Sequence, residues 1–148
     1  MKTRLKRNRL IGIVVSLFVL ILLINSCEIA EDIGGINATV AKLEGEWTCD
    51  EESEFFKATK EIYTVYISPD ADNYDGIIID GFYNLGDLGL KATLSGKTVT
   101  IPLQTLSGDF TVTGSGIISS NLEEIEWAYN VDDGSGVIDH VTALYSKN

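Results

Sequence analysis

Arginine does not occur in this sequence of 148 residues beyond Arg9, and the chain has one histidine and two cysteines. Without arginine the body of the protein lacks the usual bidentate clamp for phosphate and carboxylate groups. A single histidine, His140, leaves little capacity for acid–base catalysis near neutral pH. These absences disfavour most classes of enzyme, and the sequence predicts a protein without catalytic residues or cofactors.

Positive charge is scarce and concentrated at the N-terminus. The chain has 11 lysines and arginines against 22 acids, and five of the cations lie within the first nine residues. All 22 acids lie at or after Glu28, so the segment from residue 27 onward has six lysines and a formal charge of −16. Such a body repels nucleic acid and anionic lipid headgroups. We therefore expect no nucleic-acid partner.

The basic start is followed by an apolar run over residues 10–24, interrupted only by Gly12 and Ser16. This run is shorter than the ~20 apolar residues that a membrane-spanning helix needs. A basic segment followed by a short apolar segment is typical of a secretory signal peptide. An uncleaved membrane anchor is the alternative, and both interpretations place the rest of the chain outside the cytoplasm, tethered to a membrane.

The apolar run ends at Ile24-Asn25-Ser26-Cys27. An aliphatic residue three positions before a cysteine and a small residue directly before it resemble a bacterial lipoprotein signal, from which only Asn25 departs. The resemblance implies a signal peptide over residues 1–26 and lipid attachment at Cys27. The partner so implied is a membrane, reached through the N-terminal lipid.

Residues 27–42 are predicted to form an acidic tether between the lipid and a folded body. The acids Glu28, Glu31 and Asp32 follow the cysteine closely. They resemble the acidic stretch that sends many Bacteroidetes lipoproteins to the cell surface. The expected location is thus the outer membrane or the cell surface, and a merely soluble tether with a periplasmic body is the alternative.

With Cys27 assigned to lipid, Cys49 has no cysteine partner for an intrachain disulfide. It lies in an apparent strand with no adjacent basic residue to lower its pKa. We expect a small buried hydrophobic residue rather than a nucleophile.

The body, residues 43–148, is long enough for one small domain. Clusters of glycine, asparagine, aspartate and serine punctuate it at short intervals and separate β-branched and aromatic runs. The segments Asn37 to Leu43 and Glu52 to Lys60 are each compatible with one short helix. The expected strands are 43–49, 60–68, 77–83, 88–94, 97–104, 110–118, 123–131 and 137–146.

Apolar residues alternate with polar ones in several of these strands, which indicates one buried and one exposed face. The clearest case is the seventh, where Glu124 and Glu126 alternate with apolar residues. The residues expected to face inward are Tyr63, Val65, Ile67, Leu88, Leu90, Ala92, Leu94, Val99, Ile101, Leu103, Ile125, Trp127, Tyr129 and Val131.

Short strands joined in order by tight turns predict an all-β antiparallel meander. Eight such strands can close into a small barrel, which removes exposed sheet edges. Gly114 and Gly116 suit the kinks of a small barrel. Pro102 predicts a bulge or an edge in the fifth strand, and a β-sandwich is the alternative architecture.

Gly45-Glu46-Trp47 resembles the G-x-W signature of lipocalins, and the layout of eight strands after a lipoprotein signal is similar to small lipocalin-like lipoproteins of gut Bacteroidetes. In that family the tryptophan packs across the closed end of the barrel beneath a basic residue of the last strand. Lys147 is the residue in that place here. The body is shorter than a typical lipocalin, so a shallow cavity or none is expected.

Two groups of acids are candidate sites. Asp70, Asp72 and Asp75 have oxygen ligands suited to Ca²⁺, but their spacing departs from that of an EF-hand loop and favours a hairpin loop, so no metal site is expected. Paired carboxylates are the apparatus of glycoside hydrolysis. The candidates for it are predicted to be surface acids: Asp50, Glu51, Glu52, Glu54, Glu123, Glu124 and Glu126.

Four aromatic residues are candidates for lining a ligand pocket: Tyr63, Phe82, Trp127 and Tyr129. Aromatic residues with few polar groups form small-molecule sites, but they also fill ordinary barrel cores. His140 is expected at the surface or the rim. The preferred hypothesis is a lipid-anchored, non-enzymatic lipoprotein that binds a small apolar or amphipathic molecule or presents a surface to an envelope protein. The alternatives are a structural accessory subunit with a filled barrel and, third, an acidic glycan hydrolase.

Overall fold

The structure is a computed structural model that describes residues 36–55 and 61–148. The predicted signal peptide, Cys27 and the acids that follow it lie outside the described residues. The described residues make up the folded body of the protein.

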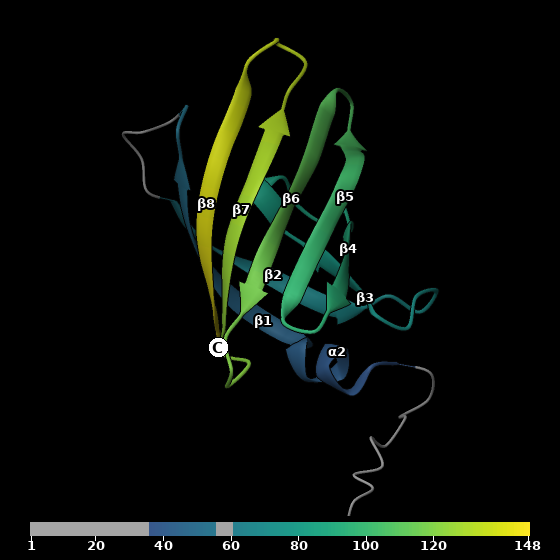
Figure 1. Cartoon of the computed structure of the whole chain (residues 1–148). Coiled ribbons are helices and arrows are strands. Elements are labelled where there is room, and N and C mark those ends of the chain that lie inside the picture. The colour runs from purple at the N-terminus through teal and green to yellow at the C-terminus, as the bar shows by residue number, and fades with distance from the viewer. Residues whose placement is uncertain (1–35, 56–60) are drawn as a thin grey trace, which may run out of the picture. The chain divides into compact units, whose positions relative to one another are not determined.

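Eight antiparallel strands form a closed barrel in which each strand pairs with its predecessor (Figure 1). Strand β8 returns to β1, from Trp47 opposite Lys147 to Ser53 opposite Val141. This closure confirms the predicted meander barrel and excludes the sandwich. The strands are β1 (Gly45–Ser53), β2 (Glu61–Pro69), β3 (Gly76–Asp80), β4 (Leu90–Ser95), β5 (Thr98–Ser107), β6 (Phe110–Ile118), β7 (Glu124–Asp132) and β8 (Ile138–Lys147).

Alternation along the strands determines which side chains fill the barrel. In β7 the four residues from Ile125 to Val131 that were expected inside are buried, and Glu124 and Glu126 are exposed. Strand β8 shows the same period, with Asp139, Val141, Ala143 and Tyr145 buried. One continuous core results, as expected for a sheet with one dry face.

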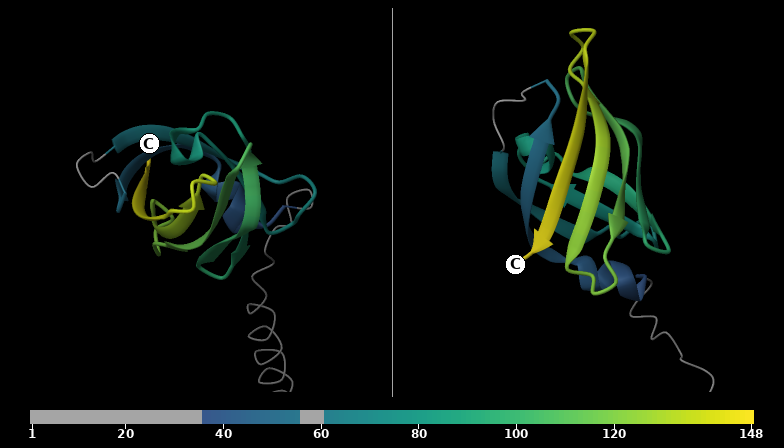
Figure 2. Two further views of the ribbon diagram at one scale, coloured as in Figure 1. Left: turned by 90° about the horizontal axis from the view of Figure 1, so that it is seen from above. Right: turned by 60° about the vertical axis from the view of Figure 1, so that its left-hand side comes forward.

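A short helix, α2 (Ala38–Leu43), precedes β1 and lies at the end of the barrel where β1 begins (Figure 2). The Asn37 side chain caps it by accepting a hydrogen bond from the Thr39 amide at 2.8 Å, which satisfies one of the free N–H groups of the first turn. Val40 and Leu43 are fully buried in the core. Of the two segments compatible with a helix, the first forms α2 with Asn37 as its cap, so residues 38–42 of the expected tether belong to the folded body. In the second, residues 52 and 53 continue β1.

Trp47 closes this same end of the barrel. Its side chain is fully buried, and its indole Nε1 donates a hydrogen bond to the Leu43 carbonyl at 2.9 Å. The Lys147 ammonium lies 5.5 Å from the centroid of the Trp47 ring, within the range of a cation–π contact, and donates to the Lys42 carbonyl. Trp47 and Lys147 thus lie as the resemblance to lipocalins implied.

The expected strand over 77–83 ends early, at Asp80. Gly81 has a φ of 80°, and the chain enters a 3-10 turn, η1 (Phe82–Asn84), in which Tyr83 and Asn84 also have positive φ. A strand cannot continue through left-handed backbone. Strand β4 begins at Leu90 rather than at 88, and the prediction that Leu88 faces inward is wrong, because Leu88 lies in the exposed loop.

Pro102 produces the predicted bulge. The pairing of β5 with β6 shifts register between Ile101 and Gln104, because proline has no N–H to donate to the ladder. The extra residue reverses the alternation. The prediction that Leu103 faces inward is therefore wrong, and its side chain is 76% exposed.

Candidate functional site

A pocket of about 170 Å³ lies at the end of the barrel that includes the turn between β7 and β8. Helix α2 lies at the opposite end (Figure 2). We call this pocket the mouth pocket. The tip of β1, the segment after β3, the start of β6 and the turn between β7 and β8 contribute to it, as the view from above in Figure 2 helps to follow. Its walls are Phe55, Tyr83, Leu85, Phe110, Val131, Asp133, Ser135, Val137 and Asp139.

Asp139 is the most deeply placed polar group of the mouth pocket, with only 6% of its surface exposed. Its Oδ2 accepts hydrogen bonds from the Ser53 hydroxyl at 2.7 Å and from the Tyr83 hydroxyl at 2.8 Å. Its Oδ1 accepts one from the Phe55 amide at 3.0 Å. Burial, and then the bond to Asp139, raise the pKa of Tyr83, so this phenol stays a donor. The carboxyl group is held in a fixed orientation by three donors.

A second acid, Glu51, is buried inside the barrel. The hydroxyls of Tyr63 and Tyr129 both donate to its Oε2. Burial raises the pKa of Glu51, and the two tyrosine hydrogen bonds oppose that rise without cancelling it. The prediction that Glu51 is a surface acid is wrong, because β1 continues to Ser53 and its alternation turns Glu51 inward with Cys49 and Ser53.

Of the four aromatic residues predicted to line a pocket, Phe82, Trp127 and Tyr129 are buried in the barrel core, and Tyr63 is partly buried against it. Tyr63 and Tyr129 donate hydrogen bonds to Glu51. The centroid of the Phe82 ring lies 4.6 Å from that of the Tyr129 ring. Trp127 packs against Tyr145 at 5.5 Å between centroids. None of the four lines the mouth pocket, which has other aromatic walls. Whether any of them contacts a ligand stays a prediction.

Gly114 and Gly116 of β6 accommodate these rings. A Cβ at Gly114 would lie 2.4 Å from the Cβ of Tyr129, and a Cβ at Gly116 would lie 2.6 Å from the Trp127 ring. Side chains at either position would displace β7. The two glycines therefore let the β7 aromatics lie directly on the backbone of β6, which is what fills the barrel at this level.

Cys49 is buried in the core and is unsuited to nucleophilic chemistry. Burial raises the pKa of its thiol to about 12, so the reactive thiolate is scarce at neutral pH. The predicted role as a small buried hydrophobic residue is confirmed.

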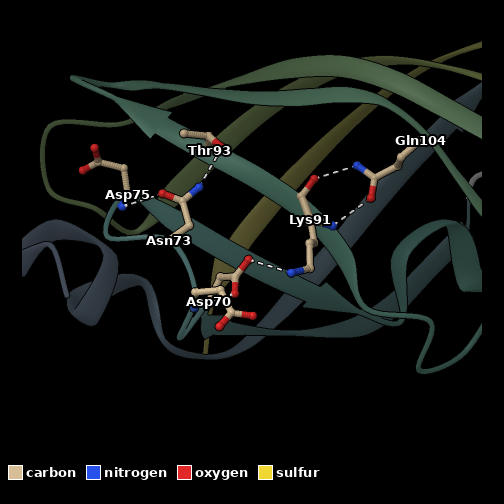
Figure 3. Close-up of polar contacts among 7 residues, drawn as sticks. Asp70, Asn73, Asp75, Lys91, Thr93 and Gln104 are labelled. Atoms are coloured by element: carbon tan, nitrogen blue, oxygen red, sulfur yellow. Dashed lines mark hydrogen bonds and ion pairs between the residues drawn. The ribbon is translucent and has the colours of Figure 1, made fainter. Parts of the chain in front are cut away.

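The acidic loop between β2 and β3 is a hairpin connection held by its own hydrogen bonds (Figure 3). Asp70 accepts from the Asp72 amide at 3.1 Å and from the Lys91 ammonium at 3.0 Å, and these contacts lower the pKa of Asp70. The Asn73 side chain bridges the Asp75 amide and the Thr93 hydroxyl. Within residues 36–55 and 61–148, no group of three or more His, Cys, Asp or Glu side chains is arranged to hold a metal ion.

A wider and more open groove of about 690 Å³ lies on the outer surface across β1, β8, β7 and β6. Outward-facing residues such as Glu52, Asn130 and His140 form much of its wall. His140 Nδ1 lies 2.6 Å from the Asn130 Oδ1. His140 is exposed, as predicted.

No protein-family model matches this chain, and no curated protein matches it at the significance required. Neither α2 nor any other helix in the described part of the chain has the length and apolar character needed to cross a membrane. The closed eight-stranded barrel is compatible with a lipocalin-like fold.

Changing Glu51 to glutamine should make the protein progressively more stable than the wild type as the pH rises. Because the pKa of Glu51 is raised in the folded state, its favourable contribution is complete below the ordinary value of 4.5 and is lost as the pH rises through the folded-state pKa. Glutamine keeps an acceptor for both tyrosine hydroxyls and cannot ionise. Urea unfolding of both proteins at a series of pH values from below 4.5 upward measures the difference in their free energies of unfolding.

The matched control is Glu52→Gln, which removes the same charge from an exposed neighbour on β1. It corrects for the general relief of repulsion in an acidic body. If the stability difference between Glu51→Gln and the wild type does not change with pH, or changes as it does for Glu52→Gln, the burial of Glu51 has no effect on its ionisation.

Proposed function

We propose that this chain is a lipid-anchored, extracytoplasmic lipoprotein whose barrel binds a small apolar or amphipathic molecule at its mouth. The observation that carries the binding proposal is the mouth pocket, with apolar and aromatic walls around a few fixed polar groups. Such a combination is typical of small-molecule sites. The lipid anchor rests on the resemblance of residues 1–27 to a lipoprotein signal, and the outer membrane or cell surface is the proposed location.

The size of the mouth pocket limits the ligand. Drug-sized ligands occupy pockets of roughly 300–1,000 Å³, whereas the mouth pocket has about 170 Å³. Below it the barrel is filled by Phe82, Tyr129, Trp127 and Tyr145. The pocket therefore suits one ring or a short chain, and a longer ligand would extend out of the mouth.

A structural or accessory role in the cell envelope is the second candidate, and the filled interior favours it. The wide outer groove and exposed apolar residues such as Leu103 and Ile62 would then be surfaces for an envelope protein. The two candidates differ in what happens at the mouth pocket when a small molecule is added.

The number of acids in the sequence suggests glycan hydrolysis, but their arrangement in the structure does not support it. Of the three buried carboxyl groups, Asp139 lines the mouth pocket, whereas Glu51 and Asp70 do not. Glu51 is instead occupied by two tyrosine hydroxyls. Hydrolysis needs two carboxyl groups flanking one bond of the substrate, one of them a general acid with a raised pKa. The acid that lines the mouth pocket beside Asp139 is Asp133, and hydrogen bonds from Ser135 lower its pKa.

Filling the pocket should weaken the binding of a small molecule. We expect benzyl alcohol to shift the backbone amide resonances around Tyr83, Phe110 and Val137 of the purified full-length protein, in a saturable titration. Val137 is 49% exposed at the pocket wall, so Val137→Trp should occupy the space and weaken binding by at least about tenfold, which corresponds to 1.4 kcal/mol.

Ile117→Trp is the matched control, because Ile117 is 52% exposed on the outer face of β6 and lies outside the pocket. It should leave the titration unchanged. If no small aromatic probe causes saturable shifts at the mouth, or if both variants bind benzyl alcohol as the wild type does, the binding proposal fails and the accessory role is favoured.

A further inference from the structure

The described walls of the mouth pocket have negative charge and no positive charge. Asp133 and Asp139 line it, and none of the four lysines in the described part of the chain does. Three of these lysines have other partners: Lys91 binds Asp70, Lys97 binds Ser120 and Lys147 lies over Trp47. Hydrogen bonds from Ser135 lower the pKa of Asp133. The field at the mouth therefore favours cations, as does the charge of the whole body.

Asp139 has an acceptor position left for a ligand. A carboxylate offers about four lone-pair sites, and the described residues use three of them, through Ser53, Tyr83 and Phe55. Two of these donors share Oδ2, so the Phe55 amide is the one described donor on Oδ1. A buried carboxylate without a countercharge is costly. An ammonium group that donates to Oδ1 would supply both a further hydrogen bond and the opposite charge.

The remaining walls of the pocket are suited to the apolar body of an organic cation rather than to a hydrated metal ion. Phe55, Tyr83 and Phe110 offer aromatic rings, whose faces attract ammonium groups. Leu85 and Val137 add apolar surface. A metal ion would lose bound water here and gain few oxygen ligands in return, so the walls discriminate against inorganic cations.

We propose that the mouth pocket selects a small organic cation, a primary ammonium group on an aromatic or short aliphatic body, with the ammonium on Asp139 and the body against the pocket's aromatic walls. This inference rests on the proposed function and specifies the charge of the ligand. It also accounts for an acidic residue buried at the mouth of an otherwise apolar barrel.

Three probes of similar size and different charge test the selection. Benzylammonium, benzyl alcohol and benzoate are titrated separately into the full-length protein at neutral pH, and binding is followed by the amide resonances of the mouth. We expect benzylammonium to bind at least about tenfold more tightly than benzyl alcohol, and benzoate to give no saturable shift. A tenfold difference corresponds to about 1.4 kcal/mol, which one hydrogen bond to a charged group can supply.

The outcomes separate the two proposals. If benzyl alcohol or benzoate binds as tightly as benzylammonium, the pocket binds small molecules but does not select cations, and this inference is overturned. If none of the three binds at the mouth, the proposed function itself fails.

Variants test whether Asp139 is responsible for the selection of cations. Asp139→Asn should lower the affinity for benzylammonium by about tenfold or more and leave that for benzyl alcohol nearly unchanged. An equal loss of affinity for both probes would show that Asp139 only shapes the pocket and would overturn its proposed role. The control is Asp72→Asn, the same change in the exposed β2–β3 loop at the other end of the barrel, which should change neither affinity.

Because Asp139 is buried and anchors three neighbours, Asp139→Asn can lose its fold. Asp133→Asn is then decisive, because Asp133 is exposed and lines the same pocket. We expect it to weaken the binding of benzylammonium by about threefold, which corresponds to about 0.7 kcal/mol, without affecting the binding of benzyl alcohol. An unchanged ratio of the two affinities in this variant would contradict a selection by the charge of the pocket.

Discussion

Replacing Trp47 by alanine should lower the free energy of unfolding by ~3–5 kcal/mol, the range measured for removing a large buried aromatic side chain. Trp47 is fully buried at the closed end of the barrel. It connects three parts of the fold, since it lies on β1, donates to the Leu43 carbonyl of α2 and packs beneath Lys147 of β8. Urea unfolding followed by far-ultraviolet circular dichroism measures the loss.

Trp47→Phe separates packing from the hydrogen bond. Phenylalanine keeps much of the apolar volume but leaves the Leu43 carbonyl without its donor, and an unsatisfied buried acceptor costs ~1–3 kcal/mol. We expect this variant to be intermediate between the wild type and Trp47→Ala. A loss below ~1 kcal/mol for the alanine variant would mean that Trp47 is not part of the core, and the likeness to lipocalins would then be accidental.

The fold was predictable because its local signals agree. Inward and outward residues alternate strictly in β7 and β8. Every connection between successive strands is shorter than the dozen or more residues that a parallel crossover needs, so each strand pairs with its neighbour. The strand order and closure follow from these two properties. The position of α2 also follows from a local signal, since Asn37 is a good cap and Val40 and Leu43 provide an apolar side.

The errors in the fold lie where the backbone departs from the regular period. Leu103 alternates correctly with Ile101 in the sequence, but the bulge at Pro102 inserts a residue and turns Leu103 outward. A proline reveals that a bulge is present without revealing on which side of it the period changes. The strand predicted over 77–83 is wrong from residue 81 onward for a related reason, because Gly81 with positive φ begins a turn inside an apolar run.

The candidate site was harder to predict than the fold because it consists of polar residues on inward-facing positions. Glu51 lies two residues from Cys49 on the same face of β1, and Asp139 lies two residues from Val141 on the same face of β8. The period alone would have placed Asp139 inside within the expected strand 137–146, and Glu51 inside if the expected strand 43–49 had been extended. An average preference for exposed acids favoured the opposite interpretation for Glu51. Only the tertiary structure supplies the tyrosine and serine donors that make their burial tolerable.

Replacing Cys27 by serine should abolish lipid attachment entirely. If Ile24-Asn25-Ser26-Cys27 is a lipoprotein signal, the Cys27 thiol is the only nucleophile that can accept the diacylglyceryl group, and cleavage before this residue depends on that modification. The expected product is a precursor that retains residues 1–26 and takes up no fatty-acid analogue. Metabolic labelling measures the uptake of the fatty-acid analogue, and gel mobility measures the retention of residues 1–26, both in a bacterial host that processes lipoproteins.

Cys49→Ser is the matched control, because Cys49 is the other cysteine of the chain and is buried in the barrel. Since burial raises the pKa of the Cys49 thiol to about 12, it is not available for acylation, and this variant should be labelled and cleaved as the wild type is. Unchanged label and mobility in Cys27→Ser would exclude the lipoprotein signal. Loss of label in Cys49→Ser with retention in Cys27→Ser would place the lipid on the wrong cysteine for an N-terminal tether, and the proposed anchoring of the barrel to a membrane through its N-terminus would have to be abandoned.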